Sequence, residues 1–129
     1  MSYYIETTLQ IPFEEAVAKV TAALQEEGFG VLTEIDVQAT LKKKLDVDFR
    51  RYQILGACNP QFAYRALQSE RMIGTMLPCN VIVQETDDGG VQVAAIDPIA
   101  SMQAIDNPQL EEIATVIRGK LGGVIESLV

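Results

Sequence analysis

A tight hairpin turn near residue 88 constrains the fold more than any other feature of the chain. Asp87-Asp88-Gly89-Gly90 separates two apolar segments, 77–85 and 91–96, whose side chains alternate as they do in β-strands. Strands joined by so short a turn pair antiparallel, because a parallel pair needs a long crossover connection. The turn therefore argues against a purely parallel, doubly wound sheet.

The remaining segments indicate helices and strands in alternation. Period-two alternation of apolar residues predicts three more strands, at 3–9, 30–35 and 52–58. Apolar residues spaced by threes and fours predict four helices, which end near residues 28, 45, 74 and 128. Their start signals are Pro12, Asp36, Asn59-Pro60 and Asn107-Pro108.

The order β-α-β-α-β-α-β-β-α indicates an α+β fold. We expect a single domain over 1–129, in which one largely antiparallel sheet is covered by helices on one side. Such a sheet leaves its other face bare. We expect a homodimer to bury that face.

The net charge of −8 disfavours nucleic acid as a partner, because binding a phosphate backbone depends on Lys and Arg. Half of the ten cations nevertheless lie within ten positions. This cluster is either a solvated helix end or a site for an anion or acidic partner, with Lys42, Lys43 and Lys44 as its core. The sequence shows no signal peptide and no apolar run of the ~20 residues that span a bilayer, so we expect a cytoplasmic protein.

Two segments, Cys58-Asn59-Pro60 and Pro78-Cys79-Asn80, contain the only cysteines of the chain. If strands 52–58 and 77–85 are antiparallel neighbours, the ends that carry Cys58 and Cys79 meet. Cys58 also precedes a helix N-terminus, where free amides favour a thiolate. Asn59 and Asn80 either cap the adjoining helix and turn or orient a ligand.

Three interpretations of the cysteines remain open. They are inert, because free cysteines commonly pack as small hydrophobes. They bind a soft metal, for which two thiolates fall short of a four-ligand zinc site unless a second subunit or the thioethers of Met76 and Met102 add ligands. Or they act in redox or sulfur transfer, with Cys58 as nucleophile and Cys79 as resolving thiol.

Other chemistry has little support in the residues. The chain contains no histidine, so Ser-His-Asp and Cys-His arrangements are excluded. Its glycines form neither the dinucleotide-binding nor the P-loop pattern. Asp97, which precedes Pro98 after an apolar strand, is either a turn initiator or an acid at the sheet edge.

Several blocks together resemble the domain-of-unknown-function family numbered 302. They include Gly28–Asp36 with Lys42-Lys43-Lys44, Ile54–Pro60, Ile73-Gly74, Leu77–Val81 and Asp97-Pro98. The resemblance implies an α+β fold similar to the TATA-binding-protein-like class, and a homodimer. It implies neither DNA binding nor a particular reaction, because a fold does not fix a function.

The leading hypothesis from the sequence is a cytoplasmic homodimer that binds a small ligand or soft metal in a cleft between sheet and helices. The candidate ligand-binding residues are Cys58, Asn59, Cys79, Asn80 and Asp97, and the candidate metal ligands are the two cysteines. The alternatives are a thiol-dependent enzyme and a structural or partner-binding dimer with inert thiols. The cofactor is left unassigned.

Overall fold

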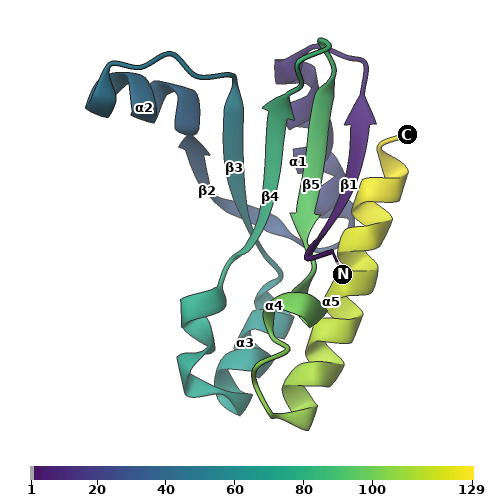
Figure 1. Ribbon diagram of the computed structural model, residues 1–129. Coiled ribbons are helices and arrows are strands. Elements are labelled where there is room, and N and C mark those ends of the chain that lie inside the picture. The colour runs from purple at the N-terminus through teal and green to yellow at the C-terminus, as the bar shows by residue number, and fades with distance from the viewer. Residues whose placement is uncertain (1) are drawn as a thin grey trace.

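The computed structural model describes residues 2–129, which form one five-stranded antiparallel sheet with helices packed on one face (Figure 1). The strands are β1 Tyr4–Leu9, β2 Gly30–Asp36, β3 Tyr52–Cys58, β4 Cys79–Glu85 and β5 Val91–Ile96. The helices are α1 Phe13–Glu26, α2 Val37–Leu45, α3 Pro60–Ser69, η1 Arg71–Met76, α4 Pro98–Ser101 and α5 Pro108–Ser127. The predicted α+β fold class is confirmed.

The strands lie in the order β1-β5-β4-β3-β2, and every neighbouring pair is antiparallel. The predicted hairpin joins β4 and β5 in the middle of the sheet. Gly89 adopts a φ of +88° at its turn, a conformation that favours glycine, and the amide of Thr86 donates to the carbonyl of Gly90 at 2.9 Å. β1 and β2 are the two edge strands.

The core lies between the sheet and the two long helices, α1 and α5. Alternate residues of the central strands, including Leu55, Val81, Val83 and Val93, are fully buried against these helices. Burying each such side chain contributes roughly 1.5–3 kcal/mol. The face of α5 that is buried carries the apolar seam predicted from the sequence, from Leu110 to Val124 and on to Leu128.

Asx-Pro pairs start three of the helices, and one of these was not predicted. Asn107 caps α5 by accepting from the amides of Gln109 and Leu110. Asp97, which the sequence predicts as either a turn initiator or an acid at the sheet edge, caps the short helix α4 in the same way. The 3-10 helix η1 was also not predicted, and β4 begins at Cys79 rather than at Leu77, because Pro78 has no amide hydrogen to donate to a strand.

Helix α2 stands apart from the core. Asp36 caps it as predicted, with its side chain accepting from the amide of Ala39 at 2.9 Å. The predicted apolar stripe of Val37, Leu41 and Leu45 does not pack into the core, however, because none of the residues of α2 is buried. The helix projects from the corner of the sheet next to β2 (Figure 1).

Candidate functional site

An apolar cavity of about 290 Å³ lies beyond one end of the sheet, between β3, α3 and α5. The C-terminal end of β3 forms one wall and the start of β4 another, while α3 and α5 close the sides. In Figure 1 this region lies where β3 runs down into α3, beside α4. Among residues 2–129, none of the side chains that line it is charged.

Small side chains explain why this space is open. Alanines occupy four lining positions, one on β3, two on α3 and one on α5, namely Ala57, Ala63, Ala66 and Ala114. Protein interiors are otherwise packed about as densely as organic crystals. Methyl groups at these positions keep the helices close to the sheet yet leave room between the larger lining residues Phe62, Leu77 and Ile117. The cavity is therefore open because these four positions carry a methyl group rather than a larger side chain.

Asn59 brings a polar group to the apolar cavity. It occupies the N-cap position of α3, as predicted, but its side chain accepts none of the α3 amides. Its Nδ2 donates instead to the carbonyl oxygen of Glu27 at 3.3 Å, which ties the start of α3 to the end of α1. Within residues 2–129 the Oδ1 atom of Asn59 has no protein donor, so it can accept a hydrogen bond from a ligand.

Both cysteines border this cavity, but they do not form a pair. In the register of the sheet, Cys79 of β4 lies opposite Ala57 of β3, and Cys58 is the next residue along β3. Cys58 itself lies opposite Gly30 of β2. Because successive side chains of a strand point to opposite faces, Cys58 and Cys79 are not directly opposed. Both thiols are free, and they are not close. The expected cysteine pair, in which Cys79 resolves a Cys58 intermediate, is therefore wrong, because such a reaction requires the sulfurs to reach bonding distance.

Burial raises the pKa of the Cys79 thiol to about 11, and the electrostatic effect of Cys58 adds a smaller increase in the same direction. Removing a thiolate from water is costly, so a largely buried cysteine without a cationic neighbour keeps its proton. At neutral pH Cys79 is a thiol. It contributes a weakly polar, polarizable surface to the cavity rather than a charge.

A second opening, here called the sulfur-lined hollow, adjoins the apolar cavity and shares five lining residues with it, namely Leu77, Pro78, Cys79, Pro98 and Met102. It measures about 300 Å³. Three of its lining residues carry sulfur: Met76 at the end of η1, Cys79 at the start of β4, and Met102 directly after α4. Asn80 and Ser101 supply polar groups beside them. Cys79 borders both openings.

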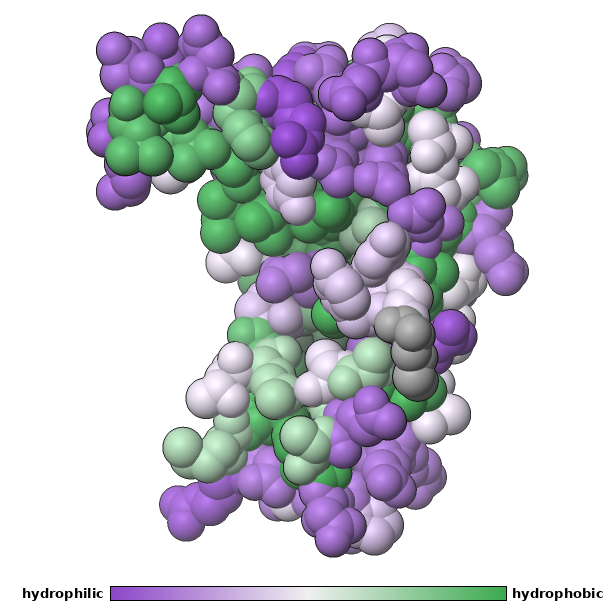
Figure 2. Space-filling view, in the orientation of Figure 1, coloured by the Kyte–Doolittle hydropathy of each residue, from purple (hydrophilic) through white to green (hydrophobic). Residues whose placement is uncertain are grey.

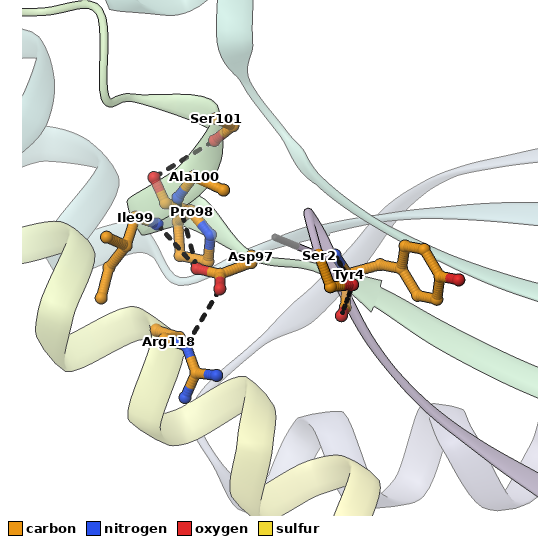
Figure 3. A network of polar contacts seen from close by, with 8 residues as sticks. All are labelled: Ser2, Tyr4, Asp97, Pro98, Ile99, Ala100, Ser101 and Arg118. Atoms are coloured by element: carbon orange, nitrogen blue, oxygen red, sulfur yellow. Dashed lines mark hydrogen bonds and ion pairs between the residues drawn. The ribbon is translucent and has the colours of Figure 1, made fainter.

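Asp97 has a structural role in this region (Figure 3). Its Oδ1 accepts from the amides of Ile99 and Ala100 at 3.0 and 3.4 Å, and its Oδ2 accepts from Nε of Arg118 at 3.1 Å. The carboxylate thus caps α4 and fastens it to α5. Asp97 does not line the apolar cavity, whereas the next residue, Pro98, does.

The remaining predicted residues lie away from the cavity. Asn80 is within β4, opposite Gly56, and does not cap a turn. The Lys42–Lys44 cluster occupies the last turn of α2, where Nζ of Lys42 pairs with Asp46 at 3.1 Å and with Asp48 at 3.4 Å. Of the proposed ligand-binding residues, the structure brings together Cys58, Asn59 and Cys79.

The residues that sequence reasoning missed are mostly apolar. Phe29, Ile113 and Ile117 line the cavity, yet nothing in their sequence context distinguishes them from core residues. The four alanines gave no signal either. The two cysteine-asparagine segments, Cys58-Asn59-Pro60 and Pro78-Cys79-Asn80, are the signals that mark this location in the sequence.

The described residues contain neither a cluster of metal ligands nor a membrane-spanning helix. Across residues 2–129, no three His, Cys, Asp or Glu side chains gather in a way that could hold a metal ion. In the same part of the chain, every helix is too short or too polar to span a bilayer.

The chain is similar in sequence and structure to an uncharacterised group of proteins. Residues 5–128 match the family described as "Domain of unknown function DUF302". A crystal structure of an uncharacterized conserved DUF302 protein from Bacillus stearothermophilus superposes with a TM-score of 0.91 at 28% sequence identity, covering 98% of each chain. None of the curated proteins compared with this chain matches it. The chain belongs to the DUF302 family.

Proposed function

We propose that this protein binds a small, neutral, largely apolar molecule in the apolar cavity. The observation that carries the proposal is an opening of about 290 Å³ that has no charged lining residue yet presents the amide of Asn59. Ligand sites are commonly apolar pockets of roughly 300–1,000 Å³ with a few well-placed polar groups. At this size the ligand is small, and an ionic ligand would lose its hydration without a compensating charge.

The polar atoms indicate what the ligand carries. Oδ1 of Asn59 is an acceptor, and the Cys79 thiol is at most a weak donor. We expect a ligand with an apolar body and one hydrogen-bond donor. A ligand lacking the donor would leave the Asn59 acceptor unpaired in an apolar setting, which costs about 1–3 kcal/mol.

Indole is a suitable probe, since it is a flat apolar molecule with a single N–H group. We expect titration calorimetry to show one indole bound per chain. Benzofuran, in which an oxygen replaces that N–H, should bind about tenfold more weakly or worse. Ala63→Leu, which places a larger side chain in the cavity, should remove the binding. Ala18→Leu, on an exposed position of α1, is the matched control and should bind indole normally.

Two results would overturn the proposal. One is an absence of indole binding to the folded wild-type protein. The other is equal binding by the wild type and the Ala63→Leu variant, which would place the probe elsewhere. A circular dichroism spectrum and a urea unfolding curve of each variant establish that the comparison is between folded proteins.

A second candidate function rests on the sulfur-lined hollow. We propose that it can hold a soft ion such as copper(I), for which thiolate and thioether are preferred ligands. The supporting observation is that Met76, Cys79 and Met102 border one opening, although they come from three different segments. Because Cys79 is a thiol at neutral pH, binding would release one proton.

Matched substitutions test this second candidate. We expect competition against a copper(I) chelator to show binding that Met102→Leu and Cys79→Ser each weaken at least about tenfold. Met72→Leu changes an exposed methionine of η1 outside the hollow, and Cys58→Ser changes the cysteine that does not line it. Both controls should retain binding. Equal loss in the Cys58→Ser variant would contradict the assignment.

A further inference from the structure

The face of the sheet that carries no helix contains an opening of about 350 Å³, here called the sheet hollow. This face is turned to the viewer in Figure 1, where α1 lies behind the strands. Two residues that are partners in the register, Ile82 of β4 and Ala94 of β5, form an apolar floor. Figure 2 shows the same side, with apolar surface in the middle of the sheet and polar surface above and below it.

A directional chain of hydrogen bonds crosses one end of the sheet hollow. Nε of Arg50 donates to Oε1 of Gln84 at 2.8 Å, and Nε2 of Gln84 donates to Oε1 of Gln92 at 2.8 Å. Nε2 of Gln92 then donates to Oε2 of Glu6 at 2.7 Å. Because the chain begins at a cation and ends at a carboxylate, it fixes the orientation of both amides. Each amide nitrogen carries two hydrogens and uses one in the chain, so both glutamines keep a spare donor.

The other end of the sheet hollow contains an exposed amide and two tyrosine rings. Asn80 lies four residues before Gln84 on β4, so the two share a face and their Cα atoms are roughly 13 Å apart. Within residues 2–129 the side chain of Asn80 forms no hydrogen bond, so both its acceptor and its donor are free. Tyr4 of β1 is 41% exposed, and the ring of Tyr3 packs edge-on against it at 5.0 Å. Only β5 separates β1 from β4, which leaves about 10 Å between their backbones.

We propose that the sheet hollow binds a neutral purine nucleoside, for which adenosine is the best match. An asparagine amide pairs with adenine through two hydrogen bonds, accepting from the amino group and donating to N7, and Asn80 has both groups free. The ring of Tyr4 offers a surface on which a flat base stacks. The ribose then extends over the apolar floor toward Gln84 and Gln92, whose spare N–H groups can donate to its hydroxyl oxygens. The sequence left open whether Asn80 caps a turn or orients a ligand, and its place within β4 excludes the turn.

Charge favours a nucleoside over a nucleotide or a nucleic acid strand. Among residues 2–129, none of the side chains that line the sheet hollow is charged, because Arg50 and Glu6 lie outside its lining. A phosphate group would therefore lose its hydration without a compensating cation, and the net charge of −8 would repel it. The proposal concerns the opposite face of the sheet from the apolar cavity and does not depend on a ligand there.

Titration calorimetry with three nucleosides of nearly the same shape tests the proposal. We expect one adenosine to bind per chain. Inosine has a carbonyl oxygen in place of the amino group, and 7-deazaadenosine has a C–H in place of N7, so each leaves one atom of Asn80 unpaired. Both should bind at least about tenfold more weakly than adenosine.

Substitution of Asn80 gives a second readout. Asn80→Ala should weaken adenosine binding at least about tenfold and should remove the discrimination among the three nucleosides. Gln25→Ala removes an exposed amide from α1, on the helix-covered side of the sheet, and is the matched control that should bind adenosine normally. Circular dichroism checks that both variants are folded. Indole binding to Asn80→Ala should be unchanged, which separates this site from the apolar cavity.

Three results would overturn the proposal. The first is an absence of adenosine binding to the folded wild type, whether the sheet hollow stays empty or a second copy of the chain covers it. The second is equal binding of adenosine and inosine, since Asn80 would then not contact the base. The third is tighter binding of AMP or of an oligoadenylate than of adenosine, which would assign the surface to a nucleotide or a strand rather than to a neutral ligand.

Discussion

At the scale of single residues, Cys79 illustrates how burial changes chemistry. The sequence predicts that the two cysteines differ, because Cys58 precedes a helix N-terminus that favours a thiolate whereas Cys79 follows a proline at the start of a strand. In the structure Cys79 packs against the hydrophobic core at the start of β4, and its pKa rises to about 11. It lines both the apolar cavity and the sulfur-lined hollow, whereas Cys58 lines only the first.

This raised pKa predicts how stability depends on pH. The unfolded chain loses the Cys79 proton near pH 9.0, whereas the folded protein keeps it to about pH 11. The contribution of the buried thiol is therefore complete below pH 9 and is lost as the pH rises from 9 to 11. Two pKa units correspond to about 2–3 kcal/mol. Urea unfolding of the wild type and Cys79→Ala across this range should show their stability difference shrinking, and parallel curves would contradict the prediction.

At the scale of secondary structure, the capping residues and prolines that start helices were more informative than the apolar stripes along them. Asn107-Pro108 predicted the start of α5 at the residue where it begins, because capping and proline act within a single turn. The same signal at Asp97-Pro98 starts α4, a helix that the sequence does not predict because no long apolar stripe follows the proline. The stripe of α2 predicted burial that does not occur, because spacing shows which residues share a face but not whether anything covers that face.

The sheet has one position where a side chain does not fit. A Cβ atom added to Gly56 of β3 would lie 2.1 Å from Oγ1 of Thr33 and 2.8 Å from Cγ of Pro78. We expect Gly56→Ala to lower the free energy of unfolding by about 1–3 kcal/mol, because the Thr33 side chain must leave its rotamer and the Pro78 ring must shift to admit the new methyl group. Gly30→Ala, in the adjacent strand, meets no atom within 4 Å and is the matched control. Similar losses in both variants, measured by urea unfolding, would contradict this account.

At the scale of the whole molecule, the uneven distribution of charge is the property that the composition concealed. A net charge of −8 indicates an acidic protein, yet residues 37–51, which comprise α2 and the segment leading to β3, carry a net charge of +3. The sequence located the cations but left open whether they form a solvated helix end or a site. In the structure no residue of α2 is buried, and the basic segment stands apart from the core of the sheet (Figure 1).

The candidate site was predictable only in part. Cys58, Asn59 and Cys79 were identified from their position between strand and helix, and they do border one cavity. Asn80 and Asp97 lie near it in the sequence but not in its lining, because Asn80 is part of β4 and Asp97 caps a helix. The alanines that open the cavity were not predictable, since their effect depends on what packs opposite them.

The sequence by itself determined the elements, their antiparallel character and the family, because turns, caps and apolar periodicity act over a few neighbouring residues. The tertiary structure decided which strands are neighbours, where a cavity remains, and which apolar helix has no cover. It also decided that the two cysteines do not meet. These properties depend on contacts between residues far apart in the chain, which local patterns do not encode.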